Sequence, residues 1–206
     1  MTMSRFRIPV HLFAAANRTA AAVLRCVLVA GLVAVSLSCT FAQAKASDYD
    51  VEAAYLFNFG KFMHLSMGSK ALRRPTFDIC ILGNDPIGQT ISGFASKEKI
   101  DGRPARIVRV RDASQAGTCD IVFIGAKDND TIREDLAILS GRDVLTVGDS
   151  PEFLKDGGMI QFVERAQRVR FAVNLNAVRK THLVLSSQLL RVAVYVKGGP
   201  KPEGAP

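Results

Sequence analysis

The stretch TFDICILGNDP at residues 76–86 joins a short apolar run to a cluster of turn-forming residues, and it sets the pattern of the chain. The apolar run predicts a strand, and Asn84 or Asp85 can cap a helix that begins at the proline, where a missing N–H costs nothing. The same order of strand, turn and helix returns from residue 120, where Asp128, Asn129 and Asp130 can cap a helix over residues 131–140, and again from residue 143. Strands that alternate with capped helices predict an α/β fold with a mostly parallel sheet, and right-handed crossovers place flanking helices on both of its faces.

The last part of the chain departs from this alternation. Residues 159–163 and 169–174 are apolar runs that flank a polar connection, and they predict a C-terminal antiparallel hairpin. Ser186 or Ser187 can then cap a final helix. We expect this helix to face the core with Leu189, Leu190, Ala193 and Val196.

Residues 48–63 (DYDVEAAYLFNFGKFM) predict an amphipathic helix that opens with acidic residues, as suits the positive end of a helix dipole. Its apolar residues recur at helical spacing, and we expect that stripe to pack in the core rather than to bind a cofactor. The stripe comprises Val51, Ala54, Tyr55, Phe59, Phe62 and Met63.

The first 46 residues hold five basic residues, no acidic residue, and an apolar run over residues 26–39 that is followed by small residues. This order predicts a cleaved export signal, with Ala42-Gln43-Ala44 or Ala44-Lys45-Ala46 as the cleavage site. A retained membrane helix is the alternative, because the apolar stretch is long enough to span a bilayer, but Arg25 interrupts it.

This prediction divides the chain into three parts. We expect residues 1–46 to be removed on export and residues 47–196 to form a single α/β domain, which does not insert into the membrane. Residues 197–206 (KGGPKPEGAP) predict a disordered tail, because their Gly and Pro support neither a helix nor a strand.

The predicted export signal changes how the net charge and the cysteines of the chain are interpreted. The chain has 27 Lys and Arg against 19 Asp and Glu, and the five basic residues of the signal account for most of the net charge of +8. The remaining surface is of mixed charge. The sequence has no basic stripe with interleaved aromatic residues, so we do not expect nucleic-acid binding. Cys80 and Cys119 are the only cysteines beyond the signal, and an even pair in an oxidising compartment predicts one disulfide.

The sequence contains no recognisable catalytic motif. His64 and His182 do not have the spacing of metal ligands, and there is no nucleophile elbow or phosphate-loop lysine. The segment GNDPIG at residues 83–88 lacks the third glycine of a dinucleotide fingerprint, which favours a role as a turn and helix cap. We therefore expect no enzyme activity, no cofactor and no metal site, and instead a protein that binds something.

Seven short motifs follow one another along residues 50–195. They are VEAAYLFNFGKF (51–62), FDICILG (77–83), CDIVFIG (119–125), LTVGD (145–149), GGMIQF (157–162), VRFAVNL (169–175) and LSSQLLRVA (185–193). Each motif is loose alone, but together and in this order they make a specific pattern. The chain resembles the YfiR-like family of small periplasmic proteins.

This resemblance implies a Rossmann-like fold, a homodimer and a regulatory role in the periplasm. It implies a repressor that binds the periplasmic domain of an inner-membrane diguanylate cyclase and so lowers cyclic di-GMP and biofilm formation. It also implies that Cys80 and Cys119 form the family's disulfide. The chain lacks the second cysteine pair of some members, and it lacks the Trp-Pro that commonly follows the first helix.

Two surfaces are candidate binding sites. The hairpin and the final helix carry arginines that can form the rim of a partner-binding face or can simply be solvated: Arg165, Arg168, Arg170 and Arg191. Loops at the carboxyl ends of parallel strands form a natural ligand crevice, here with Gly83, Asn84, Asp85, Gly148 and Asp149. The alternatives to a repressor are therefore a periplasmic small-ligand-binding module and an accessory protein of a sensor histidine kinase.

Overall fold

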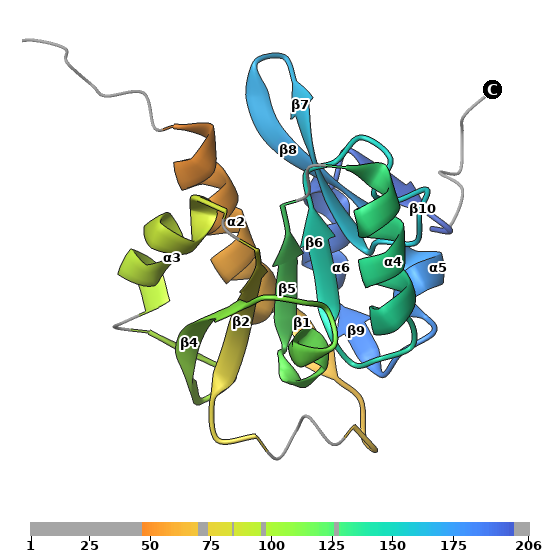
Figure 1. Cartoon of the computed structure of the whole chain (residues 1–206). Coiled ribbons are helices and arrows are strands. Elements are labelled where there is room, and N and C mark those ends of the chain that lie inside the picture. Colours follow the sequence, from red (N-terminus) through yellow and green to blue (C-terminus); the bar gives the residue numbers. More distant parts are fainter. Residues whose placement is uncertain (1–46, 70–73, 84, 96–97, 126–127, 200–206) are drawn as a thin grey trace, which may run out of the picture. The chain divides into compact units, whose positions relative to one another are not determined.

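The structure is a computed structural model that describes residues 47–69, 74–83, 85–95, 98–125 and 128–199. The predicted export signal lies outside the described residues. The centre of the domain is one eight-stranded sheet (Figure 1). From one edge to the other its strands are β10 (Tyr195–Lys197), β8 (Arg168–Asn174), β7 (Ile160–Arg165), β6 (Leu145–Gly148), β5 (Ile121–Ile124), β2 (Phe77–Leu82), β4 (Arg103–Val110) and β3 (Lys99–Ile100).

Neighbouring strands run parallel throughout this sheet except at the β7–β8 hairpin and at the β3–β4 edge. This confirms the predicted α/β fold with a mostly parallel sheet and a C-terminal antiparallel hairpin. A second, two-stranded sheet was not predicted, and it pairs β1 (Met63–Leu65) with β9 (Leu183–Leu185). Its strands are too short for their sequence pattern to separate them from loops.

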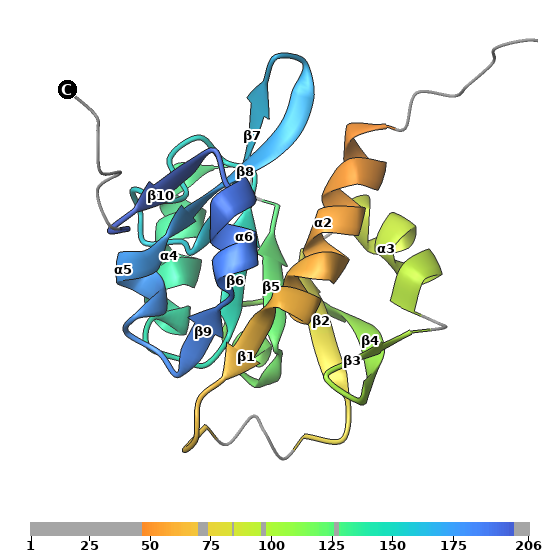
Figure 2. The ribbon, with the colours of Figure 1, turned by 180° about the vertical axis from the view of Figure 1, so that it is seen from behind.

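Helices cover both faces of the large sheet (Figures 1 and 2). One face carries α2 (Asp48–Phe62), α3 (Ile87–Ala95), α5 (Leu175–Val178) and α6 (Ser187–Val192). The other face carries α4 (Asn129–Leu139) and the 3-10 helix η2 (Gln115–Thr118). No helix in the described part of the chain is long and apolar enough to cross a membrane.

Each face of the sheet has its own apolar core, because successive strand residues point to opposite faces. In β2, Ile79 and Ile81 belong to the core under α2, whereas Cys80 and Leu82 belong to the core under α4. The strand is buried on both sides, which explains why its sequence is a continuous apolar run rather than an alternation of apolar and polar residues.

The predicted caps begin the helices. Asp128 accepts a hydrogen bond from the backbone N–H of Thr131 (2.8 Å) at the start of α4. Ser186 accepts one from the N–H of Leu189 (3.3 Å) at the start of α6. Each cap satisfies a backbone N–H that the helix itself leaves without a partner, so the side chain selects the first residue of the helix.

The final helix is shorter than predicted. It ends at Val192, and the chain then becomes extended: the N–H of Val194 donates to the C=O of Phe171 (2.9 Å), and β10 pairs in parallel with β8. Val196 and Lys197 are therefore strand residues, and the predicted tail does not begin at Lys197. The unpaired edge of β8 supplies the hydrogen bonds that favour a strand over further helical turns. Residues 200–206 lie outside the described residues.

The hairpin extends beyond the sheet that it belongs to. β7 pairs with β6 only at Ile160 and Gln161, and β8 pairs with β10 only at Ala172–Asn174. We call residues 162–171 the arm, because these residues pair across the hairpin and with no other described strand. Figures 1 and 2 show the arm projecting past the ends of β5 and β6.

Candidate functional site

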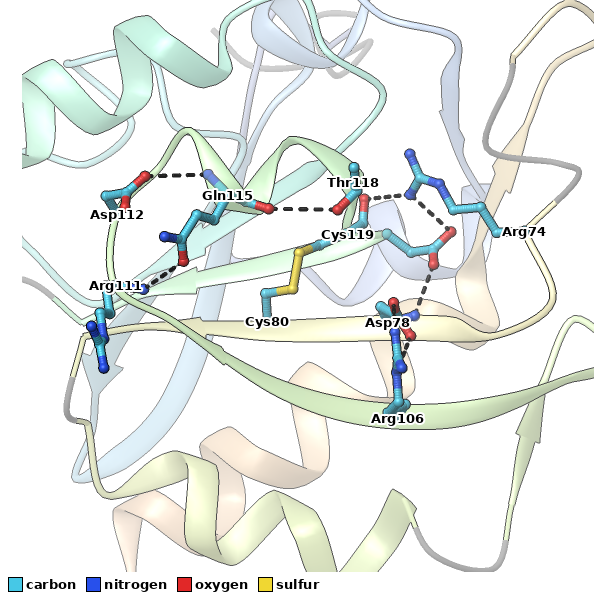
Figure 3. Close-up of a disulfide and its surroundings, with 10 residues drawn as sticks. Arg74, Asp78, Cys80, Arg106, Arg111, Asp112, Gln115, Thr118 and Cys119 are labelled. Carbon is cyan, nitrogen blue, oxygen red and sulfur yellow. Dashed lines mark hydrogen bonds and ion pairs between the residues drawn. A yellow bond between two sulfur atoms is a disulfide. The ribbon is translucent and has the colours of Figure 1, made fainter.

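A disulfide joins β2 to the residue that follows η2, as predicted for Cys80 and Cys119. Cysteines on adjacent parallel strands would be offset along the sheet. Here Cys119 precedes β5 and reaches Cys80 from η2, which lies over the same face (Figure 3). The two Cα atoms are 6.0 Å apart, a usual separation for a disulfide. Both cysteines are buried, with 1% and 2% of their surfaces exposed, so reductants do not reach the bond without local opening.

The next residue, Asp120, is a fully buried carboxylate. Its Oδ2 accepts the backbone N–H of Asp78 (2.8 Å), and its Oδ1 accepts from Nη1 of Arg103 (3.0 Å). Arg74 Nη1 lies 3.9 Å from Oδ1 and also donates to the C=O of Cys119 (2.8 Å). Burial raises the pKa of Asp120, while the Asp78 N–H and the guanidinium of Arg103 oppose this shift.

The disulfide and this network together fasten the start of β5 to β2. We call the six residues involved the β5 anchor: Arg74, Asp78, Cys80, Arg103, Cys119 and Asp120. Of these six residues, only the two cysteines were predicted from the sequence. An aspartate directly before a continuous apolar strand was an available signal, because a buried carboxylate requires partners.

The predicted ligand crevice lies at the carboxyl ends of β2 and β6, and Asn84 falls outside the described residues. The Asp85 carboxylate caps α3, since its Oδ1 accepts the N–H of Ile87 (2.9 Å). A side chain at Gly125 would collide with that same carboxylate. Asp85 therefore has a structural role at the end of β5, whether or not a ligand binds.

The two glycines of the crevice also have structural reasons. Gly83 adopts a φ of +81°, in the left-handed region that favours glycine, directly after β2. Gly148 ends β6 under the ring of Phe153, which fills the space that a side chain would need. Neither position by itself indicates a ligand.

Glu52 of α2, which was not predicted as a site residue, lies close enough to Asp85 and Asp149 for their charges to interact. Burial raises the pKa of Glu52 to about 7, and the negative charges of Asp149, Asp85 and Asp48 add to the shift. The pKa of Asp149 is also raised, by partial loss of water and by the charge of Asp85. We call Glu52, Asp85 and Asp149 the acidic cluster; its charge disfavours phosphate and other anions.

The predicted core stripe of α2 divides into two parts. Phe59 is buried, and its ring lies 5.0 Å from Phe171 and 5.8 Å from Phe162, measured between ring centroids. Tyr55 lies 5.4 Å from Phe171. This aromatic contact ties α2 to the base of the arm.

Val51 and Ala54 do not lie in the core, which corrects the prediction. The helix turns its buried face to the sheet through Ala53, Leu56 and Phe57 instead. This rotation leaves a partly exposed surface beside the aromatic contact. That surface forms a hollow of about 300 Å³ lined by Asp50, Val51, Ala54, Tyr55 and Asn58.

Three of the four predicted partner-face arginines share one side of the arm. Arg165 lies directly opposite Arg168, and Val163 lies opposite Arg170, so the pleat places these four side chains on the same side. Phe162 and Phe171 form an opposed pair one residue out of phase, and their rings face α2. The arginines therefore face away from α2.

Arg191 lies apart from the other three, in the last turn of α6. Among the described residues, none of the four arginines forms an ion pair. The structure thus brings Arg165, Arg168 and Arg170 together as an uncompensated basic strip.

His64 and His182 are the two histidines within the described residues. His182 Nδ1 lies 3.1 Å from both carboxylate oxygens of Asp143, and Asp143 Oδ1 also accepts the His182 backbone N–H (2.9 Å). This pair fastens the loop before β9 to the start of β6. His64 lies on β1. Within the described ranges, no group of three or more His, Cys, Asp or Glu residues could hold a metal ion.

Comparisons with known proteins give two findings. Residues 49–194 match a family described as YfiR/HmsC-like, and this range covers the domain from α2 to beyond α6. The fold is similar to the crystal structure of a conserved domain protein from Vibrio cholerae O1 biovar eltor str. N16961, with 10% identity and a TM-score of 0.49. That similarity covers 72% of this chain and 60% of the other. A comparison with curated proteins found no match.

Proposed function

Because the chain belongs to the YfiR/HmsC-like family, whose members are periplasmic regulators of diguanylate cyclase signalling, we propose that it represses one inner-membrane diguanylate cyclase. The match over residues 49–194 carries this proposal, since it spans nearly all of the described domain. The Cys80–Cys119 disulfide supports a periplasmic location, because such bonds persist in oxidising compartments. Repression would lower cyclic di-GMP and biofilm formation.

The proposal includes the organisation predicted from the sequence. Residues 1–46 direct export and are removed, residues 47–196 fold as one domain, and the mature protein acts as a homodimer that does not insert into the membrane. The basic strip of the arm and Arg191 are the proposed partner face.

A repressor of this kind acts by differential binding. It must bind the inactive state of the cyclase more tightly than the active state, because equal affinity for both would shift nothing. A tenfold preference corresponds to only ~1.4 kcal/mol, so robust silencing requires several times that free energy. A face with an apolar centre and a charged rim can supply it.

Gene deletion followed by complementation tests this function. Deletion should raise cyclic di-GMP and surface attachment, and re-expression of the full chain should restore both to baseline. A version that lacks residues 1–46 should fail to complement, because it would stay in the wrong compartment. Equal repression by that cytoplasmic version would refute the periplasmic mechanism.

The neighbouring genes can distinguish a cyclase partner from a histidine kinase partner. A neighbouring reading frame that encodes a membrane-anchored cyclase supports repression, whereas a neighbouring histidine kinase supports the accessory role. Co-purification of the exported protein with the product of that reading frame, and loss of co-purification when the arm is altered, would identify the partner.

A small-ligand-binding role is the second candidate, at the crevice that contains Gly83, Asn84, Asp85, Gly148 and Asp149. The acidic cluster favours a cationic or neutral ligand there over an anion. Thermal-shift measurements with spermidine and with citrate test this candidate. Stabilisation by spermidine that is lost in Asp149→Asn would support it, and the absence of any shift would speak against it.

A further inference from the structure

We propose that the outer edge of β8 within the arm pairs with an extended segment of the partner protein whose side chains alternate between acidic and apolar. This inference rests on the proposed function, which supplies a protein partner, and it adds the chemistry of the contact and the edge at which it forms.

The backbone of the arm offers an unpaired strand edge on β8. The N–H of Asn174 donates to the C=O of Met159 (2.8 Å), which identifies these two residues as a hydrogen-bonded pair of the antiparallel ladder. Because such pairs alternate along a ladder, Val169 and Glu164 form a non-hydrogen-bonded pair, and the N–H and C=O of Val169 point outward. An exposed edge of this kind is a template for an added strand.

The chain itself already uses the lower part of this edge. β10 pairs with β8 at Ala172–Asn174, and Val194 donates to the C=O of Phe171. Within the described residues no strand continues this pairing toward Val169. A partner segment would therefore extend the sheet from the point where Val194 leaves it.

The charge of the arm selects an acidic partner segment. Arg165 and Arg168 lie directly opposite each other across the ladder, and like charges in that position are destabilising. Arg170 lies on the same side. In an added strand every second side chain would lie beside this basic strip, and carboxylates there would neutralise it.

The remaining side chains of the added strand would lie on the α2 side, beside Val169 and Phe171. Both residues belong to or pack against the core, so the β8 part of this side is apolar, and Glu164 on β7, opposite Val169, is its one charged residue within the arm. An exposed apolar residue also lies close to the edge in sequence: Val192, at the end of α6 and two residues before Val194, has 62% of its surface exposed. The alternation of acidic and apolar side chains follows from these two sides.

The outer edge of β7 does not suit the same segment. It carries Glu164, and its base pairs with β6 at Gly148, directly before Asp149 of the acidic cluster. Two carboxylates along that edge would repel an acidic strand. This contrast assigns the contact to β8.

The turn of the arm supports a binding role. Ala166 and Gln167 have φ values of 52° and 57°, in a left-handed region where glycine or asparagine is usually found in two-residue hairpins. This turn and the repulsion between the opposed Arg165 and Arg168 both lower the stability of the arm. Backbone strain of this kind is concentrated at functional sites.

A peptide-binding experiment tests the proposal with the full chain exported and purified from the periplasm. The probes are two fluorescein-labelled peptides of the same composition, one that alternates Asp and Val and one in which the Asp and Val residues form separate blocks. Fluorescence anisotropy should show that the alternating peptide binds at least tenfold more tightly than the blocked one. Equal affinities would overturn the proposal, because charge alone would then explain binding.

Matched variants locate the contact. Val169→Pro removes the outward N–H on β8 and should weaken binding at least tenfold, whereas Glu164→Pro makes the same change on the opposite edge and should leave the affinity unchanged. Val169→Thr keeps the N–H and controls for the side chain. Unchanged affinity in Val169→Pro, or equal losses in both proline variants, would overturn the assignment to β8.

The double variant Arg165→Gln/Arg168→Gln leaves the backbone intact, and it should weaken binding severalfold with a melting temperature no lower than that of the unaltered protein. Unchanged binding would overturn the role of the basic strip. Recruitment by phosphatidylglycerol vesicles without binding of the alternating peptide would also overturn the proposal in favour of a membrane contact. These results do not depend on the deletion experiment, so failure of the repressor function and failure of this inference can be told apart.

Discussion

The β5 anchor and the arm differ in whether their charged side chains have partners of opposite charge. In the anchor, the buried Asp120 has a backbone donor and two arginines, and a covalent bond adjoins it. In the arm, Arg165 and Arg168 oppose each other without an acidic partner among the described residues. The difference suggests that one region stabilises the domain and that the other is kept incomplete for a partner.

Loss of the disulfide should have the largest effect on stability. Cys80→Ser or Cys119→Ser opens a loop closed across 39 residues of sequence separation. The chain-entropy model predicts a loss of ~3–4 kcal/mol, which corresponds to a melting temperature lower by roughly 10 °C for a domain of this size. Calorimetry of both single variants measures it, and an unchanged melting curve in both would show that the anchor does not depend on its covalent bond.

Removal of the Asp120 charge should have the next largest effect. Asp120→Asn keeps the size of the side chain but leaves Arg103 without a charged partner, and we expect a loss of about 2 kcal/mol in the free energy of unfolding. Asp130→Asn removes an exposed carboxylate from an ion pair with Arg133 on α4, and it should change stability by less than about 0.5 kcal/mol. Equal effects in chemical denaturation would remove the distinction between the anchor and the surface.

The acidic cluster should make stability depend on pH. The folded-state pKa of Glu52, about 7, exceeds its ordinary value of 4.5, so the folded protein binds this proton more tightly than the unfolded chain does. The resulting stabilisation is fully present below pH 4.5 and is lost as the pH rises through 7. Because Glu52 is only partly buried, we expect the loss to reach about 1–2 kcal/mol.

Glu52→Gln should remove the part of this dependence that comes from Glu52. The variant should be more stable than the unaltered protein above pH 7 and should lose that advantage toward pH 4.5, as followed by melting temperature across the range. Glu134→Gln, on α4, is the control substitution. A constant difference between Glu52→Gln and the unaltered protein at every pH would contradict the assignment of the shift to Glu52.

The smallest effect should be a gain of stability in the arm. Ala166→Asn/Gln167→Gly supplies residues that adopt the left-handed conformation of this turn readily, and we expect a stabilisation of about 1 kcal/mol. Denaturant unfolding measures this gain. A loss of stability would mean that the turn is not strained and would weaken the contrast with the anchor.

Local signals predicted most of the fold. The caps of α4 and α6 were predicted because a side chain and a backbone N–H three residues away interact whatever the tertiary structure is. The central strands were predicted because they are continuous apolar runs. The predicted final helix was too long, because pairing of β10 with β8 depends on a strand edge that lies distant in sequence.

The candidate sites were predicted less completely for the same reason. Cys80 and Cys119 were identified because they are the only two cysteines beyond the predicted signal. Glu52 was missed, because its altered pKa arises from Asp149 and Asp85, which approach it only in the folded chain. The side of the arm on which the arginines lie depends on the register of the hairpin.

By itself, the sequence determined the α/β class, the helix caps, the disulfide pair and the resemblance to the family, because each depends on residue type and short-range order. Only the tertiary structure decided how α2 is rotated, which charges are paired, and which strand edge is left open. Those properties depend on contacts between residues far apart in the chain, and packing against the sheet selects among arrangements that local sequence allows equally.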